Sequence, residues 1–264
     1  MRAEQLMEQV SAILIRAGDE IIMPAYAASV ETQHKADGSI VTETDMACQV
    51  FIERELASID PAIGFLGEEM TQQQQLECLH ADHTTFWCLD PLDGTTNFAT
   101  SFPGFAISLA LISDGDVTMA CTYDPVRREL FSATAGHGAT LNGKRICCSQ
   151  EQELANSVGF VDFKRLNSET ASHFASKKIF RSQRNIGSCA LEWAWLAAGR
   201  GQFIIHGGEK LWDFAGGSLL ASEAGCCVGD FSGRALFPVS SLSSPILATC
   251  SPTIQEKLKL HLSI

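Results

Sequence analysis

The segment LDPLDGTTNF, residues 89–98, is the most informative stretch of this chain. It continues the apolar run FWCL, residues 86–89, which is typical of a buried strand. Asp90 and Asp93 flank a Pro-Leu pair, so a turn at the strand end would aim both carboxylates at one point. The same turn would leave the Leu92 carbonyl exposed between them. The segment therefore predicts a group of oxygen ligands at the end of a strand.

The next residues of the segment have the composition of an anion site. Gly94, Thr95 and Thr96 supply backbone N–H groups at an expected helix start, where unpaired amides and the helix dipole favour a phosphate. Metal ligands beside an anion site indicate a phosphate ester as substrate. Taken alone, the segment is also compatible with a plain turn and a helix cap, because Asp, Pro and Gly are common turn residues.

Two further acidic motifs stand at a strand end and a helix start. Glu68 and Glu69 follow the strand-like run GFL, residues 64–66, and Asp213 follows Trp212 at the start of a helical pattern. Alone, the first motif is explained by a solvated loop and the second by a helix N-cap. Layered α/β proteins place ligand sites at such ends, and carboxylates gathered there need a cation between them. Ligands that are all oxygen favour magnesium, manganese or calcium.

Composition indicates a globular protein and narrows its partners. The chain has 264 residues, of which 45% are hydrophobic and 19% charged, and it carries a formal net charge of -12. This charge argues against binding nucleic acid through bulk electrostatics, but not against an anionic substrate, since bound metal ions reverse the local sign. The longest apolar stretch, residues 105–112, is interrupted by Ser108 and is far shorter than the roughly 20 residues of a membrane span. We therefore expect no nucleic-acid partner and no membrane segment.

The ten cysteines are expected to be free thiols. They include two adjacent pairs and no C-x-x-C, and no cysteine-histidine spacing suits a zinc site. The prediction is a reduced, mostly buried set of cysteines in a cytoplasmic protein.

Apolar periodicity predicts the elements of the first hundred residues. A helix is expected over about residues 3–28, with Pro24 ending or kinking it. A second helix is expected over about residues 45–59, capped by Thr42 or Thr44. The glutamine run that begins at Gln72 is interpreted as a surface loop.

The remainder of the chain alternates strands and helices. Residues 104–147 read as an antiparallel meander with turn signals between its strands. From about residue 151 onward, strand and helix patterns alternate to the end. We expect an α/β fold in a single domain over residues 1–264, with a strand-rich first half of about residues 1–150 and an alternating second half of about residues 151–264.

The motifs together resemble the inositol monophosphatase family, a group of magnesium-dependent, lithium-sensitive phosphatases. The resemblance rests on five segments, in matching order and spacing: KADGSIVTETD at 35–45, GEE at 67–69, LDPLDGTTNF at 89–98, WDFAGG at 212–217 and SEAG at 222–225. It covers essentially the whole chain. It implies the layered αβαβα sandwich shared with fructose bisphosphatases, and a homodimer.

The resemblance implies two to three magnesium ions in each site. Glu68, Asp90 and the Leu92 carbonyl would hold one ion. Asp90, Asp93 and Asp213 would hold a second, and Glu68 would reach a third through water.

The resemblance also implies roles for residues near the phosphate. The backbone amides of Gly94 and Thr95 would bind it. The Thr95 hydroxyl, with Asp45 behind it, and Glu68 would orient the attacking water. Lys35 matches a lysine on a mobile loop near the site.

The alcohol half of the substrate would meet a set of residues from three segments: Asp93, Gly187, Ser188, Cys189 and His206. His206 departs from the family pattern, because the inositol phosphatases have a substrate-contacting glutamate seven residues before the metal-binding aspartate. Every metal ligand implied by the resemblance is present, so the phosphatase chemistry looks intact. A histidine does not reproduce a carboxylate, so the preference for inositol is open. The alternative is that His206 only ends a strand at the surface.

The sequence thus predicts a magnesium-dependent phosphomonoesterase acting on inositol monophosphate or a related sugar or polyol phosphate through a metal-activated water. An alternative is the same chemistry on histidinol phosphate, fructose 1,6-bisphosphate or a 3′-phosphoadenosine nucleotide. Some relatives that take the nucleotide or histidinol phosphate have a lysine at the position of Thr96, so Thr96 and Asn97 favour the inositol type. A non-catalytic regulatory protein on the same fold is a further alternative, which loss of a metal ligand would favour.

Overall fold

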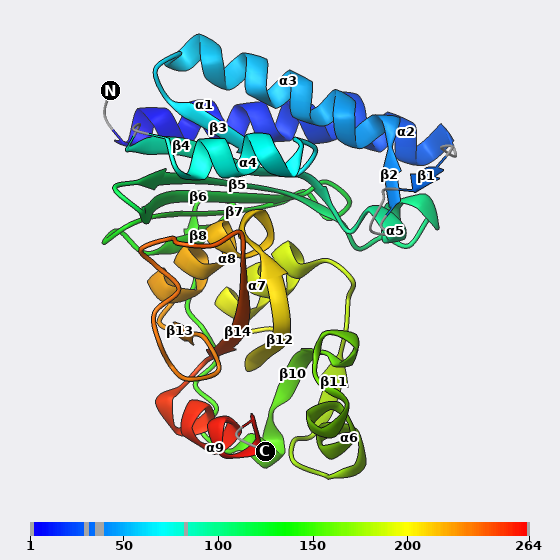
Figure 1. Cartoon of the computed structure of the whole chain (residues 1–264), viewed down its shortest axis with the longest axis vertical. Coiled ribbons are helices and arrows are strands. Elements are labelled where there is room, and N and C mark those ends of the chain that lie inside the picture. The colour runs from blue at the N-terminus through cyan, green and yellow to red at the C-terminus, as the bar shows by residue number, and fades with distance from the viewer. Residues whose placement is uncertain (1–2, 29–31, 35–39, 82–83, 263–264) are drawn as a thin grey trace.

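The computed structural model describes residues 3–28, 32–34, 40–81 and 84–262. These residues form five layers, helix–sheet–helix–sheet–helix, stacked along the long axis of the molecule (Figure 1). The layered αβαβα arrangement implied by the sequence is confirmed. Lys35 lies outside the described residues.

The first two layers come from the first half of the chain. The outer layer holds α1 (Ala3–Ala17), α2 (Met23–Ala28) and α3 (Glu43–Ile59). The sheet beneath it has the strand order β3-β4-β5-β6-β7-β8-β9, in which β3 and β4 are parallel and the other pairs antiparallel. Its strands are β3 (Gly64–Gly67), β4 (Thr85–Asp93), β5 (Ala106–Ser113), β6 (Asp116–Asp124), β7 (Glu129–Thr134), β8 (Ala139–Leu141) and β9 (Lys144–Arg145). The predicted meander corresponds to β5 through β9.

The other three layers come from the second half. The middle layer holds α7 (Cys189–Ala197) and α8 (Leu211–Glu223), and the outer layer holds α6 (Ser168–Ser176) and α9 (Pro252–Leu262). Between them lies a sheet of order β11-β10-β12-β14-β13. Its strands are β10 (Val158–Asp162), β11 (Ser182–Arg184), β12 (Phe203–Lys210), β13 (Cys227–Gly229) and β14 (Ser243–Thr249).

The remaining elements are smaller. They are the ribbon of β1 (Thr32–His34) and β2 (Ile40–Thr42), the helices α4 (Gln72–Leu79) and α5 (Thr95–Ala99), and the 3-10 turns Leu154–Asn156 and Phe163–Arg165. Within the described residues, none of the helices has the length and apolar character that a membrane span requires.

Alternating side chains of the strands build the cores on both faces of the first sheet. On β4, Trp87 and Leu89 pack against α1 and α3, whereas Phe86 and Cys88 face α7 and α8. The middle helices are buried between two sheets, which explains why α8 is apolar over most of its surface. All ten cysteines are free thiols, as predicted, and only Cys147 is exposed.

Two helices differ from the sequence predictions in an informative way. The first helix is interrupted by a π-helical turn, Gly18–Ile22, immediately before α2, which contains Pro24. Proline has no N–H for the carbonyl four residues earlier, so the predicted kink takes the form of a widened turn. The glutamine run that was expected to be a loop forms α4, which the capping box between Thr71 and Gln74 begins. The loop prediction was wrong because it weighed polarity above the capping pattern.

Candidate active site

The Asp90–Asp93 segment is part of a strand and not a turn after it. β4 continues to Asp93, with a register shift against β5 between Asp90 and Asp93. Pro91 cannot donate to the sheet, and the irregular register absorbs it. The Leu92 N–H instead donates to Asp90 Oδ1 at 3.0 Å. The expected turn is therefore corrected to a β-bulge, which still directs both carboxylates to the same side.

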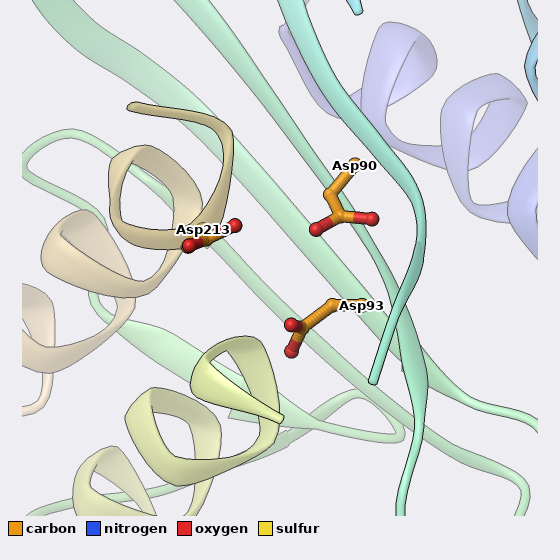
Figure 2. A group of neighbouring side chains, drawn as sticks. All are labelled: Asp90, Asp93 and Asp213. Atoms are coloured by element: carbon orange, nitrogen blue, oxygen red, sulfur yellow. The ribbon is translucent and has the colours of Figure 1, made fainter. Parts of the chain in front are cut away.

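Asp213 reaches the same point from the second half of the chain. It lies in the first turn of α8, where the Lys210 N–H donates to its Oδ2 at 3.3 Å. Asp90, Asp93 and Asp213 each offer a carboxylate oxygen, and these oxygens lie within 4.8 Å of one another. Figure 2 shows the three side chains converging from the β4 bulge and the start of α8.

The electrostatics of this cluster favour a bound cation. Burial raises the pKa of Asp90 and of Asp213 well above the ordinary value, and the neighbouring carboxylates raise both further. Burial also raises the pKa of Asp93, to about 6. A divalent ion bound to the three oxygens would relieve this repulsion. An all-oxygen donor set fits Mg²⁺ or a similar hard cation.

Glu68 approaches the cluster without joining it. It follows β3, and its N–H donates to the Leu89 carbonyl at 3.0 Å. Its charge raises the pKa of Asp90 and of Asp213, and it lines the same pocket. Among the described residues, the group that meets the 4.8 Å distance holds the three aspartates and not Glu68.

Gln75 fixes the backbone that carries Glu68. This buried side chain, on α4, donates through Nε2 to the carbonyls of Gly67 and Glu68, each at 3.0 Å. Gln75 could not be predicted from the sequence without α4, the helix that carries it.

Thr95 and Asp45 form a hydrogen-bonded pair beside the cluster. The Thr95 hydroxyl oxygen is 2.9 Å from Asp45 Oδ1 and 3.1 Å from the Leu92 carbonyl. Asp45 Oδ2 accepts from the backbone N–H and hydroxyl of Thr42, which is the N-cap of α3. Burial raises the pKa of Asp45. Asp45 thus joins the start of α3 to the threonine that the sequence associated with the attacking water.

Gly94 makes the expected helix start possible. It is the N-cap of α5 with φ of 89°, and a Cβ at this position would lie 2.8 Å from the Gly104 carbonyl oxygen. Gly94 and Thr95 both line the pocket next to the aspartates. The first amides of a helix have no partner within it, so this turn offers donors to an anion.

The start of α7 binds the Asp93 carboxylate through two hydrogen bonds. The Ser188 hydroxyl donates to Asp93 Oδ2 at 2.5 Å, and the Ala190 N–H donates to the same oxygen at 2.7 Å. Gly187 has φ of 75° in the tight approach to the helix. Burial raises the pKa of the Cys189 thiol well above its ordinary value, so this residue packs in the pocket wall and does not supply a thiolate.

His206 lies within β12 and forms part of the pocket wall. Its side chain is buried, with Nδ1 accepting from the Gly208 N–H at 3.1 Å. This bond leaves Nε2 to carry the proton, 3.7 Å from Asp162 Oδ2. Burial lowers the pKa of His206 to about 4. The alternative that it ends a strand at the surface is therefore wrong.

The same pocket, of about 630 Å³, contains residues that the sequence analysis did not single out. They include Asp162, Arg165, Asn185, Glu192 and Lys210. Glu192 is the one acidic residue of α7; its Oε1 accepts from the Ile186 N–H at 2.6 Å, and burial raises its pKa to about 8. In the sequence, the signal that could have identified Glu192 is a single acidic residue within an apolar helical pattern.

The chain is similar to known proteins over most of its length. The model of the inositol monophosphatase family matches residues 3–262. Inositol monophosphatase 1 of Solanum lycopersicum is 36% identical over 248 residues, which are 91% of this chain and 88% of that protein. Nus factor SuhB of Escherichia coli K12 is 36% identical over 210 residues, 78% of this chain and 77% of that protein. The crystal structure of the extragenic suppressor protein suhB from Bartonella henselae matches with a TM-score of 0.87 and 29% identity, covering 98% of each chain.

Proposed function

The chain belongs to the inositol monophosphatase family, and from that premise we propose that it hydrolyses phosphate monoesters of inositol or of a related sugar or polyol. The observation that carries the proposal is the three-aspartate cluster beside the Gly94–Thr95 amides. A cation site next to an anion site suits a substrate whose phosphate must be both neutralised and held.

The family and the oxygen-only donors support magnesium as the cofactor, with two to three ions per site. Asp90, Asp93 and Asp213 would hold one ion, and Glu68, Asp90 and the Leu92 carbonyl a second, with Glu68 facing a third. Bound magnesium supplies a water of lowered pKa and stabilises charge on the attacking and leaving oxygens.

The protein residues position the reacting groups. The amides of Gly94 and Thr95 would donate to the phosphate oxygens. The Thr95 hydroxyl can donate one hydrogen, and Asp45 Oδ1 and the Leu92 carbonyl both lie within its reach. Donation to Asp45 leaves a Thr95 lone pair free to accept from the attacking water, so Thr95, Asp45 and Glu68 would orient that water for in-line attack.

The alcohol would lie against Asp93 and the wall formed by Gly187, Ser188, Cys189 and His206. Since His206 donates through Nε2, it would bind a hydroxyl or anionic oxygen as a donor, in contrast to a glutamate. Histidinol phosphate, fructose 1,6-bisphosphate and a 3′-phosphoadenosine nucleotide remain the alternative substrates. Lys35 is proposed to approach the site from its loop.

A regulatory role is the second candidate, because relatives that are 34–36% identical bear the name Nus factor SuhB. The complete set of carboxylates favours the enzyme. The net charge of -12 supports a small phosphate ester, and not nucleic acid, as the direct ligand. We further propose one domain over residues 1–264, a homodimer, and a cytoplasmic location without membrane attachment.

A phosphate-release screen over about a dozen esters tests the function. Inositol 1-phosphate, sugar phosphates, histidinol phosphate and a 3′-phosphoadenosine nucleotide are offered with magnesium and with a chelator. The proposal expects magnesium-dependent release that is fastest from a polyol or sugar ester. Absence of release from every ester would favour the regulatory role.

A further inference from the structure

Glu209 is a buried acid that the proposed mechanism does not use. It lies near the end of β12, with 1% of its surface exposed. Its Oε2 accepts from Trp193 Nε1 at 2.7 Å, and no described residue forms a hydrogen bond with Oε1. Burial raises the pKa of Glu209 well above its ordinary value, which outweighs the opposite effect of the Trp193 hydrogen bond. Glu209 is therefore a neutral acid that accepts a hydrogen bond from a neighbouring helix.

Trp193 connects this hydrogen bond to the helix that binds Asp93. It lies in α7 and is fully buried. At the start of the same helix, the Ser188 hydroxyl and the Ala190 N–H donate to Asp93 Oδ2. Because a short helix moves as a unit, a displacement of Trp193 would also displace the two donors that hold Asp93.

On the other side of the hydrogen bond, Glu209 directly precedes the segment that holds Asp213. Lys210 follows it as the N-cap of α8, and the Lys210 N–H donates to Asp213 Oδ2 at 3.3 Å. The pairing of β12 with β14 shifts register between His206 and Glu209, so the sheet is irregular just before this point. The Glu209 side chain therefore anchors an irregular stretch of β12 to α7.

The two helices also pack closely beside this hydrogen bond. The α7 and α8 helices lie side by side in the middle layer (Figure 1). A Cβ at Gly217 of α8 would overlap the Trp193 side chain, so the close approach depends on glycine at that position. Packing limits how near the helices come, whereas a directional hydrogen bond also limits how far one slides along the other.

We propose that Glu209 is a positioning residue, which through Trp193 holds the start of α7 and the start of α8 at the separation that lets Asp93 and Asp213 share a metal ion. This inference rests on the proposed metal-dependent function. Glu209 does not line the pocket, so it acts through the two helices and contacts neither the ion nor the ester. It would keep the ligands in place before the metal arrives, which lowers the cost of binding.

The test measures the dissociation constant of magnesium by calorimetry on the metal-free protein. Glu209→Leu removes the acceptor and should raise this constant by about 10-fold to 100-fold, as is typical when a group that supports a ligand is lost. Trp193→Phe removes the donor and should act in the same direction. Glu209→Gln keeps an acceptor oxygen in a neutral side chain and should bind magnesium as the wild type does. If Glu209→Leu does not fold, Trp193→Phe and Glu209→Gln decide.

A tryptophan on the same helix provides the matched control. Trp195 Nε1 has no hydrogen-bond partner among the described residues, so Trp195→Phe makes the same chemical change without breaking a hydrogen bond. It should leave the dissociation constant unchanged. The double variant of Glu209→Leu and Trp193→Phe should be no weaker in magnesium binding than the weaker single variant, because both substitutions remove one interaction.

Urea unfolding of each variant separates positioning from general stability. Variants that unfold more easily but bind magnesium as the wild type does would overturn the inference. Equal weakening of magnesium binding in Glu209→Gln or in Trp195→Phe would overturn it as well. A wild type that binds magnesium but hydrolyses no ester would contradict the proposed function, and the comparison of dissociation constants would still decide the role of Glu209.

Discussion

At the scale of single residues, Asp93 connects β4 to the start of α7. One oxygen accepts from Ser188 and Ala190 at the start of α7, and the side chain also belongs to the aspartate cluster. Asp93→Asn keeps an oxygen for the Ala190 N–H but removes a charged ligand. We expect phosphate release to fall by about 100-fold or more, because loss of a metal ligand costs several kcal/mol of charge stabilisation.

The folded state of this variant should be as stable as the wild type without metal, because one repelling carboxylate is gone. Circular dichroism and urea unfolding check this point. Asp116→Asn, which changes an exposed aspartate at the start of β6, is the matched control and should retain activity. Near wild-type turnover of Asp93→Asn at saturating magnesium would show that Asp93 is not a ligand.

His206 carries the prediction on substrate choice. His206→Glu should raise the preference for inositol 1-phosphate over other esters by about 1–3 kcal/mol, the worth of one good hydrogen bond to the non-reacting part. The new carboxylate would lie near Asp162, so the double variant with Asp162→Asn is measured in parallel to remove their repulsion. Hydrolysis of p-nitrophenyl phosphate should be nearly unchanged. Equal changes in kcat/KM on both esters would assign His206 a structural role.

At the scale of elements, α4 positions Glu68 through one side chain. Gln75→Ala would leave the carbonyls of Gly67 and Glu68 without their donor, which should cost roughly 1–3 kcal/mol of stability. Activity should fall roughly 10-fold to 100-fold, with a higher magnesium requirement, as expected when a group that supports a ligand is lost. Gln73→Ala changes an exposed glutamine of the same helix and should reduce neither stability nor activity. A stability loss without any shift in magnesium dependence would limit Gln75 to a structural role.

Element prediction from the sequence was accurate where periodicity and caps agreed. The helix capped by Thr42 and the antiparallel meander were both predicted. The β4 bulge was not predicted, because a D-P-L-D sequence is compatible with both a turn and an irregular strand. Only its pairing with β5 distinguishes the two. Gln75 was missed because its hydrogen bonds to the Gly67 and Glu68 carbonyls depend on α4, which was predicted to be a loop.

At the scale of the whole molecule, the buried acids couple stability to pH. Folding raises the pKa of Asp90, Asp93, Asp213, Glu192 and Glu209, mainly through burial. A group with a raised folded pKa stabilises the protein fully below its unfolded pKa and loses that contribution as pH rises through the folded value. The free energy of unfolding of the metal-free protein should therefore fall by a few kcal/mol between about pH 5 and pH 8.

His206 opposes this trend, because its lowered folded pKa of about 4 adds stability as pH rises to its ordinary value of 6.5. The buried acids with raised pKa values, Asp45 included, outnumber it, so the net slope remains downward. Urea unfolding at several pH values in chelator checks the slope, and magnesium should flatten it by binding the ionised aspartates. Glu192→Gln should reduce the slope in the upper part of the range. Stability that rises steadily to pH 8 in chelator would contradict the account.

The five-layer architecture was available from the sequence through family resemblance and alternation of strand and helix patterns. The identity of the alcohol could not be predicted from the sequence, because His206 stands where the resemblance would place the glutamate that contacts the substrate. The pocket wall that is proposed to recognise the alcohol combines β10, β12 and α7, and their packing is set by apolar contacts that no short motif records.

The central claim is that the aspartate cluster binds the metal on which phosphate-ester hydrolysis depends. Its most direct test is phosphate release from inositol 1-phosphate as magnesium is added to metal-free wild type and to Asp213→Asn. The account predicts no release without metal, a saturable rise in the wild type, and little or no rise in the variant. Full release in the presence of chelator, or the same magnesium response in both proteins, would contradict it.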